Sequence, residues 1–115
     1  MSEVETLFTK IIKREIPADI VYEDDKCISF KNIDPQAPIH VLLVPKIVIP
    51  KLSMAAAEHQ EILGYLMLKA GDIAHKLGIG NDFRLVVNNG EGVGQSIFHL
   101  HLHILGGREF KWPPG

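Results

Sequence analysis

Three histidines alternate with apolar residues near the end of this 115-residue chain, in the run from Phe98 to Ile104. Side chains at alternate positions of a β-strand project from the same face. If residues 97–105 form a strand, His99, His101 and His103 stand in one row, with neighbours about 6.5–7 Å apart. The apolar residues between them would then face the core. Three imidazoles in such a row can contact one small group placed between them.

A histidine row of this kind can serve three purposes. It can be a solvated polar face without chemistry, which is the usual state of one isolated histidine on a strand. It can bind zinc and leave a fourth position for water, although the nearest additional candidates, Asp34 and His40, do not stand at a recognisable ligand spacing. It can also act on phosphate, because a neutral imidazole is available near pH 7 as nucleophile, acid or base. We favour the third purpose and predict that no metal and no cofactor takes part.

The segment before the histidines offers what phosphoryl transfer needs besides a nucleophile. Such a transfer requires donors for the equatorial oxygens and a proton for the leaving group. Gly90, Gly92 and Gly94 would allow backbone N–H groups to approach an anion closely, and Gln95 and Ser96 add side-chain donors. No Gly-Lys-Ser/Thr follows the glycines, so this segment is not a P-loop.

Two helices are predicted around these residues. The first spans about residues 4–14, where the apolar side chains share one helical stripe. Ser2 and Glu5 can form its capping box, and Pro17 ends it. The second helix is predicted over Ser53–Leu77, with the serine as its N-cap and a glycine after its last residue.

Short segments of strand-forming residues predict five strands, at Ile20–Glu23, Cys27–Lys31, Val41–Val44, Phe83–Asn88 and Ile97–Leu105. The run Val41–Val44 is apolar on both faces and is therefore expected at the centre of the sheet. The resulting order is αβββαββ, without βαβ alternation. This order predicts an α+β fold with a mainly antiparallel five-stranded sheet and two helices.

Composition and charge narrow the class of protein. A chain of 115 residues with 46% hydrophobic and 23% charged residues predicts one compact domain over 1–115, with 106–115 as an irregular tail. A net charge of −2 without a basic run argues against a nucleic-acid partner. The longest apolar run is too short for a membrane span. Cys27 has no disulfide partner, and the acidic N-terminus lacks an apolar segment, so we expect a cytoplasmic protein.

The sequence His99-Leu100-His101-Leu102-His103 resembles the signature of the histidine triad (HIT) superfamily, and the chain is expected to adopt the fold of that superfamily. Residues 94–98, the Gly-Gly-Arg of 106–108 and the Trp-Pro-Pro-Gly of 112–115 resemble the Hint branch, the histidine triad nucleotide-binding proteins. The likeness covers nearly the whole chain. Further matches in the same order lie at 8–12, 16–18, 22–25, 34–40 and 86–88.

This resemblance implies a homodimer that hydrolyses purine nucleoside 5′-phosphoramidates or acyl-adenylates to the monophosphate. By position, His101 would be the nucleophile that forms a covalent nucleotidyl-histidine, with its other ring nitrogen donating to a backbone carbonyl. His99 and His40 would support the site. Ser96 would serve the α-phosphate and the leaving group.

The resemblance also implies a nucleotide site assembled from distant parts of the chain. Its expected residues are Phe8, Ile11, Phe30, Asn32, Ile33, Asn88, Gly94, Gln95, Ser96, His101, His103 and Trp112. Among these, Asn88 and His103 would contact the phosphate region. Trp112 would approach the site of the partner subunit and shape the leaving group that fits there.

Other functions remain open at this point. The chain could hydrolyse dinucleoside polyphosphates, bind nucleotides as an adaptor with little turnover, or hold zinc with the same three histidines. The Gly-Gly-Arg after the histidines and the Trp-Pro-Pro-Gly end argue for the Hint branch over dinucleoside polyphosphate hydrolysis. A third histidine where the nucleotidylyltransferase branch has glutamine argues against that branch.

Two positions depart from the Hint pattern. Asn32 stands where these proteins usually carry an aspartate that holds the ribose hydroxyls, and Val48 stands where a histidine is common. An amide can still hydrogen-bond a hydroxyl. However, a hydrogen bond to an ionised group contributes ~1.5–3 kcal/mol, against ~0.5–1.5 kcal/mol for a neutral pair.

The Asn32→Asp variant is therefore expected to bind a nucleoside monophosphate up to about tenfold more tightly than the natural chain. The added negative charge lies on the ribose contact, where the two hydroxyls can donate to it. Isothermal titration calorimetry of both proteins measures the difference. An unchanged affinity would show that residue 32 does not contact the ribose.

Overall fold

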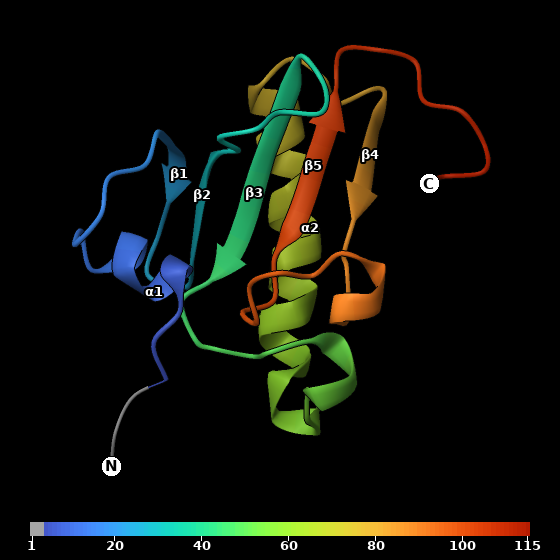
Figure 1. Cartoon of the computed structure of the whole chain (residues 1–115). Helices are drawn as coiled ribbons and strands as arrows, with labels where there is room; N and C mark the ends of the chain where they lie inside the picture. The colour runs from blue at the N-terminus through green and yellow to red at the C-terminus, as the bar shows by residue number, and fades with distance from the viewer. Residues whose placement is uncertain (1–3) are drawn as a thin grey trace.

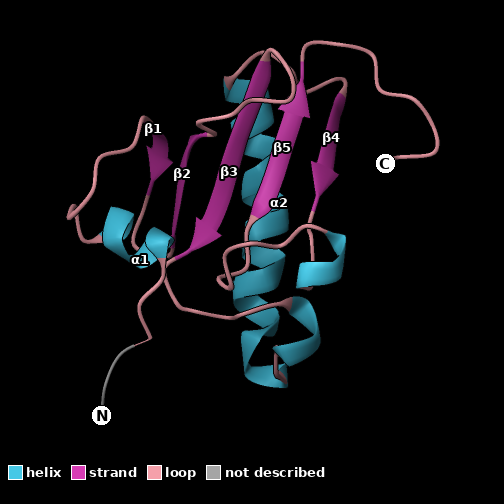
Figure 2. Ribbon diagram, viewed as in Figure 1, coloured by secondary structure: helices cyan, strands magenta, loops and turns pink. Residues whose placement is uncertain are grey.

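The computed structural model describes residues 4–115, which form one five-stranded sheet with two helices (Figures 1 and 2). The elements are α1 (Leu7–Ile12), β1 (Ile20–Glu23), β2 (Cys27–Lys31), β3 (Ile39–Pro45), α2 (Gln60–Lys76), β4 (Phe83–Val86) and β5 (Leu102–Gly106). The strand order is β1-β2-β3-β5-β4, and all four neighbouring pairs are antiparallel. The predicted α+β fold is confirmed.

The central strand β3 separates two apolar layers. Alternate residues Val41 and Leu43 face α2, which lies along one side of the sheet (Figure 1). Leu42 and Val44 face the other side, where Phe8 of α1 packs against them. Burial of both faces explains why this strand reads as a continuous apolar run and confirms its predicted central place.

The first helix is shorter than its apolar stripe predicts, because its cap lies inside the predicted range. It begins at Leu7, and Thr6 is the N-cap: the Thr6 hydroxyl accepts from the Thr9 N–H, and the Thr9 hydroxyl accepts from the Thr6 N–H. The predicted cap at Ser2 lies outside the described residues. The helix ends at Ile12, and Arg14 turns the chain with φ 63° before the proline is reached.

The second helix begins seven residues later than predicted, at Gln60 instead of Ser53. Two 3-10 turns, Leu52–Met54 and Ala57–His59, precede it and are separated by extended backbone at Ala55 and Ala56. The Nδ1 atom of His59 accepts from the Ala56 N–H at 2.9 Å and closes the second turn. His59 is also the N-cap position of α2 in place of the predicted serine, but its side chain makes no capping hydrogen bond to that helix.

The last strand is also shorter than predicted. Residues 97–101 are outside the ladder, and pairing of β5 begins at Leu102, opposite Leu43. Two residues further along β3 the chain reaches Pro45, which has no N–H to donate to a neighbouring strand. The alternation of the side chains nevertheless continues for one more step, because Leu100 is buried in the α2 core. Phe98 is 43% exposed, contrary to the expected inward position.

The remaining segments are irregular. β4 ends at Val86, two residues short of its predicted end, and the strand β5 takes in Gly106, so the tail covers 107–115. In residues 4–115 there is no helix with the length and apolar character needed to cross a membrane.

Replacing Ser29 by alanine is expected to leave the fold unchanged and to raise the free energy of unfolding by up to ~1 kcal/mol. The Ser29 hydroxyl is fully buried in the sheet and has no hydrogen-bond partner among the described residues. Its removal therefore relieves an uncompensated desolvation. The Cys27→Ser variant adds a hydroxyl to the same core and should destabilise. Urea unfolding measures both, and a loss of stability in Ser29→Ala would contradict the argument.

Candidate active site

His99 is a structural part of the site and does not face a ligand. Its ring is fully buried, and both ring nitrogens are engaged. Nε2 lies 2.7 Å from the carbonyl oxygen of Pro45, so Nε2–H must donate there. Nδ1 then accepts from the hydroxyl of Thr6 at 2.9 Å. The residue ties the start of α1 to the end of β3, and it has no ring nitrogen left to contact a substrate.

His101 has the opposite arrangement, with one nitrogen engaged and one available. Its Nδ1 lies 2.8 Å from the carbonyl oxygen of His99, so Nδ1–H donates and the Nε2 lone pair is unprotonated. The ring is 8% exposed and stands edge-on to Phe8, with ring centroids 4.9 Å apart. Within residues 4–115, Ser29 Oγ is the sole fully enclosed side-chain nitrogen or oxygen without a partner. Nε2 of His101 must therefore reach solvent.

His103 and His40 form a second pair whose protons are placed by the backbone. The N–H of Gln36 donates to Nδ1 of His40 at 3.0 Å, which forces the His40 proton onto Nε2. That Nε2–H donates to Nδ1 of His103 at 2.9 Å. The neutral His103 ring must then carry its own proton on Nε2. The His101 and His103 ring centroids are 5.1 Å apart, so the site presents a lone pair beside an N–H donor.

Asn32 lies next to this pair without disturbing it. Its amide nitrogen is 3.0 Å from Nε2 of His40, and both atoms carry hydrogens in the tautomer set by Gln36. The amide therefore does not compete with His103 for the His40 proton. The Asn32 oxygen accepts from the N–H of Asp34 at 3.2 Å, which fixes the side chain at the edge of the site.

Burial keeps the histidines of the cluster neutral. Desolvation lowers the pKa values of His40, His99 and His101 below their ordinary range, because a charged imidazole loses hydration in the interior. The pKa of His103 is lowered to about 4, first by burial and then by the proximity of His101 and His40. A neutral His101 ring and a neutral His103 ring are thus the resting state at physiological pH.

Gln95 holds the glycine-rich loop in place. Its side chain is buried, its amide nitrogen donates to the carbonyls of Pro50 and Ile97, and its amide oxygen accepts from the Gly90 N–H. Because all of these partners are backbone groups of the protein, the amide stabilises the loop and does not serve as a donor to a ligand. The loop glycines turn with positive φ, 110° at Gly90 and 101° at Gly94, a conformation that side chains disfavour.

The other predicted site residues divide into buried and exposed groups. Phe8, Ile11 and Phe30 are buried together on the histidine side of the sheet, and the ring of Phe8 contacts both His99 and His101. Ile33 is 98% exposed and Trp112 is 81% exposed, so neither packs against the cluster. The remaining two, Ser96 and Asn88, are exposed and half-buried respectively, and no side-chain hydrogen bond joins either to the described residues.

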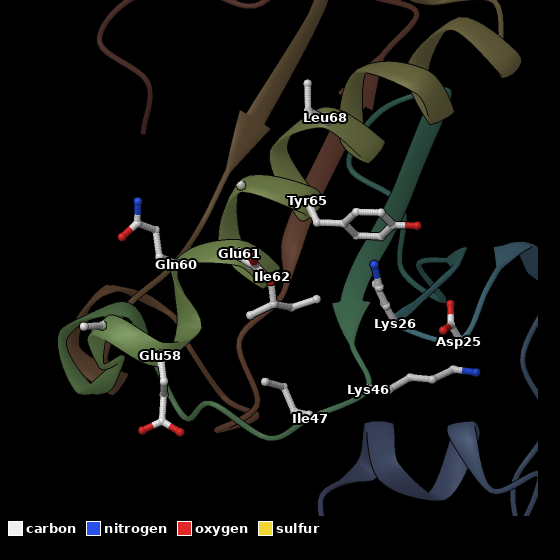
Figure 3. A pocket seen from close by; sticks show the side chains of 12 residues that line it. Asp25, Lys26, Lys46, Ile47, Glu58, Gln60, Glu61, Ile62, Tyr65 and Leu68 are labelled. Atoms are coloured by element: carbon white, nitrogen blue, oxygen red, sulfur yellow. The ribbon is translucent and has the colours of Figure 1, made fainter.

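A hollow of about 1000 Å³ lies beside α2 (Figure 3). In it the ring of Tyr65 extends toward Lys26, whose ammonium lies 4.7 Å from the ring centroid. Lys46 at its edge pairs with Glu23 at 2.9 Å. No histidine lines this hollow, and its charged groups are paired or open to solvent. It does not resemble a catalytic centre.

Among the described residues, no group of three or more His, Cys, Asp or Glu side chains is arranged to hold a metal ion. The hydrogen bonds explain this geometry. The facing nitrogens of His40 and His103 share one proton, and one nitrogen of His101 and both nitrogens of His99 bond elsewhere.

Three contributors to the site were missed in the sequence: Thr6, Gln36 and Pro45. Gln36 and Pro45 act through backbone atoms, and the type of a residue does not indicate such a contact. Thr6 could have been found as an alternative cap for α1, because Thr6 and Thr9 have the same spacing as Ser2 and Glu5.

Known proteins resemble this chain in sequence and in fold. The model of the HIT domain family matches residues 13–110. A HIT-like protein of Synechocystis is 64% identical over 111 residues, which cover 96% of this chain and 97% of the relative. A 14 kDa zinc-binding protein of Zea mays is 48% identical, with 96% of this chain and 88% of the relative covered. The crystal structure of a HIT family hydrolase from Legionella pneumophila is 41% identical, covers 96% of this chain and 100% of its own, and superposes with a TM-score of 0.94.

The proton positions can be tested directly by nitrogen-15 NMR of the imidazoles. At pH 7 His101 should be protonated on Nδ1, and His40 and His103 on Nε2, with His103 staying neutral down to about pH 4. A His101 ring protonated on Nε2 at pH 7 would contradict the assigned tautomers.

The lowered pKa of His103 also predicts how stability changes with pH. An unfolded chain protonates these rings near pH 6.5. The free energy of unfolding should therefore decrease as the pH falls from about 6.5 toward 4.

Proposed function

The chain belongs to the HIT domain family, and we propose that it is a hydrolase of purine nucleoside phosphoramidates or acyl-nucleotides. One observation carries the proposal: the accessible Nε2 lone pair of His101 stands beside the Nε2–H donor of His103. A lone pair can attack phosphorus, and a neutral donor beside it can bind a phosphoryl oxygen. The solved relative called a hydrolase supports the same reaction class.

The first step forms a bond between Nε2 of His101 and the α-phosphorus and breaks the P–N bond. The amine leaves with the electron pair of that bond and takes up one proton. His101 becomes cationic as it is nucleotidylated, and the carbonyl of His99, 2.8 Å from Nδ1, stabilises that charge. The oxyanion of the phosphoryl group is bound by the N–H of His103.

His103 is a donor in this mechanism and does not supply the proton for the amine. If the neutral ring gave up its Nε2–H it would become an imidazolate. The pKa of about 4 describes loss of a proton from the cationic ring, so it does not make this further deprotonation easier. The proton is expected to arrive through the exposed hydroxyl of Ser96 and water. In the second step water attacks the same phosphorus and gives one proton back to solvent along the same route. The P–Nε2 bond breaks with its electron pair returning to Nε2, and the nucleoside monophosphate leaves.

The nucleotide is proposed to lie against the layer that contains Phe8, Ile11 and Phe30, with its ribose near Asn32. Phe8 contacts the nucleophile from one side and supports this placement of the sugar and base. The protein is also proposed to form a homodimer. Its support is the unpaired edge of β4 in the sheet and the apolar side chains that this chain leaves exposed, among them Met67 and Leu68 of α2 and Trp112.

The decisive test is mass spectrometry of the protein quenched with an adenosine 5′-phosphoramidate. A nucleotidyl adduct is expected on His101 in the natural chain. The His101→Ala variant should form none and should lose at least ~10³-fold in turnover, because no other nucleophile is in place. The His75→Ala variant, which changes an exposed histidine on α2, is the matched control and should keep full activity.

Three results would each replace this function by another. Equal slow turnover by the natural chain and His101→Ala would favour a nucleotide-binding adaptor. Loss of activity in EDTA, restored by zinc, would favour metal chemistry, a possibility raised by the zinc-binding relative in Zea mays. Faster turnover of a dinucleoside polyphosphate than of the phosphoramidate would favour that alternative substrate.

A further inference from the structure

The ring of Phe110, in the tail after β5, is contacted by two guanidinium groups. The carbon centre of the Arg108 guanidinium is 4.0 Å from the ring centroid, and that of Arg84 is 5.1 Å from it. Arg84 belongs to the edge strand β4, whereas Arg108 precedes Phe110 in the tail. Cations over an aromatic face are attracted by its quadrupole. The stack therefore joins the tail to the edge of the sheet.

Hydrogen bonds from the same arginines hold the tail at two further points. Arg84 Nη2 donates to the carbonyl of Lys111 at 3.1 Å. Arg108 Nε donates to the carbonyl of Gln36 at 3.1 Å. Because Gln36 also donates its N–H to His40, Arg108 holds the peptide segment that sets the proton of the histidine pair.

The turn that leads into the tail is equally constrained. Gly107 has φ +91°, and a Cβ at that position would meet Pro38 Cβ at 3.0 Å. Both facts require glycine and close packing of the turn on the loop before β3. The tail then passes the beginning of β4 and lies beyond that edge of the sheet (Figure 1).

Trp112 follows these anchored residues directly and is 81% exposed. We propose that Arg84, Phe110 and Arg108 form a clamp that positions the tail, so that Trp112 is held in one direction. The use of that indole at the active site of a second copy rests on the proposed function. The three clamp residues act through Trp112 and are positioning residues, not catalytic ones.

The clamp can be tested without any activity, because Trp112 is the chain's one tryptophan. Time-resolved fluorescence anisotropy of the natural protein should decay mainly with overall tumbling. In Phe110→Ala the tail loses its anchor, and a large component of nanosecond motion should appear. Phe110→Tyr keeps the ring and should behave as the natural chain. Lys111→Ala, which retains the carbonyl bound by Arg84, is the matched control in the tail and should also be unchanged.

Kinetics then test what the clamp is for. Release of Trp112 should raise KM several-fold for a phosphoramidate with a bulky aromatic amine. It should leave kcat for the unsubstituted phosphoramidate unchanged. Sedimentation of each variant verifies that the oligomeric state is the same. If Phe110→Ala does not fold, Arg84→Gln removes one guanidinium and the bond to the Lys111 carbonyl, and the same change in anisotropy is expected.

The outcomes separate the clamp from the reaction. Unchanged anisotropy in Phe110→Ala or, where that variant is unfolded, in Arg84→Gln overturns the clamp. Increased motion with an unchanged KM for the bulky substrate overturns the link from Trp112 to a second active site. If the natural protein forms no adduct on His101, the proposed function fails, and the anisotropy alone decides the clamp.

Discussion

Two backbone groups, one N–H and one carbonyl, determine which nitrogen carries the proton in the imidazoles that contact them. The N–H of Gln36 can only donate, so Nδ1 of His40 accepts. The carbonyl of His99 can only accept, so Nδ1 of His101 donates. These two contacts set the protons of His40, His103 and His101, and the Pro45 carbonyl sets that of His99. The fold thus sets one lone pair and one N–H side by side without using a charged residue.

The sheet places these backbone groups by ending where it does. β3 and β5 pair up to Leu43 and Leu102, and the chain before Leu102 leaves the ladder near Pro45. The Pro45 carbonyl is then free to accept from His99, and the His99 carbonyl is free to accept from His101. A longer ladder would have committed such carbonyls to neighbouring strands. The end of the strand therefore contributes as much to the site as the strand itself.

The parts of this structure that could be predicted from the sequence are those in which apolar residues recur at a regular spacing. Alternation from Leu100 to Ile104 places the apolar residues in the core, and the doubly apolar Val41–Val44 predicts the central strand. The boundaries were less predictable, because Thr6 and Ser2 are both good caps and propensity does not choose between them. The role of Gln95 could not be predicted at all. Its amide looked like a donor for a ligand, but three backbone groups occupy it, and one of them, the carbonyl of Pro50, lies 45 residues away and is brought to it only by folding.

Thr6 illustrates how narrow the choice of residue becomes when one atom has two partners. Its oxygen accepts from the first turn of α1 and its hydrogen is given to Nδ1 of His99. Aspartate is among the best N-caps but has no hydrogen to give at neutral pH. Opposite Nδ1 it would draw a proton onto the His99 ring and leave an enclosed cation next to His101. A substitution that strengthens the helix would in this way alter the charge of the site, so position 6 is suited to a hydroxyl alone.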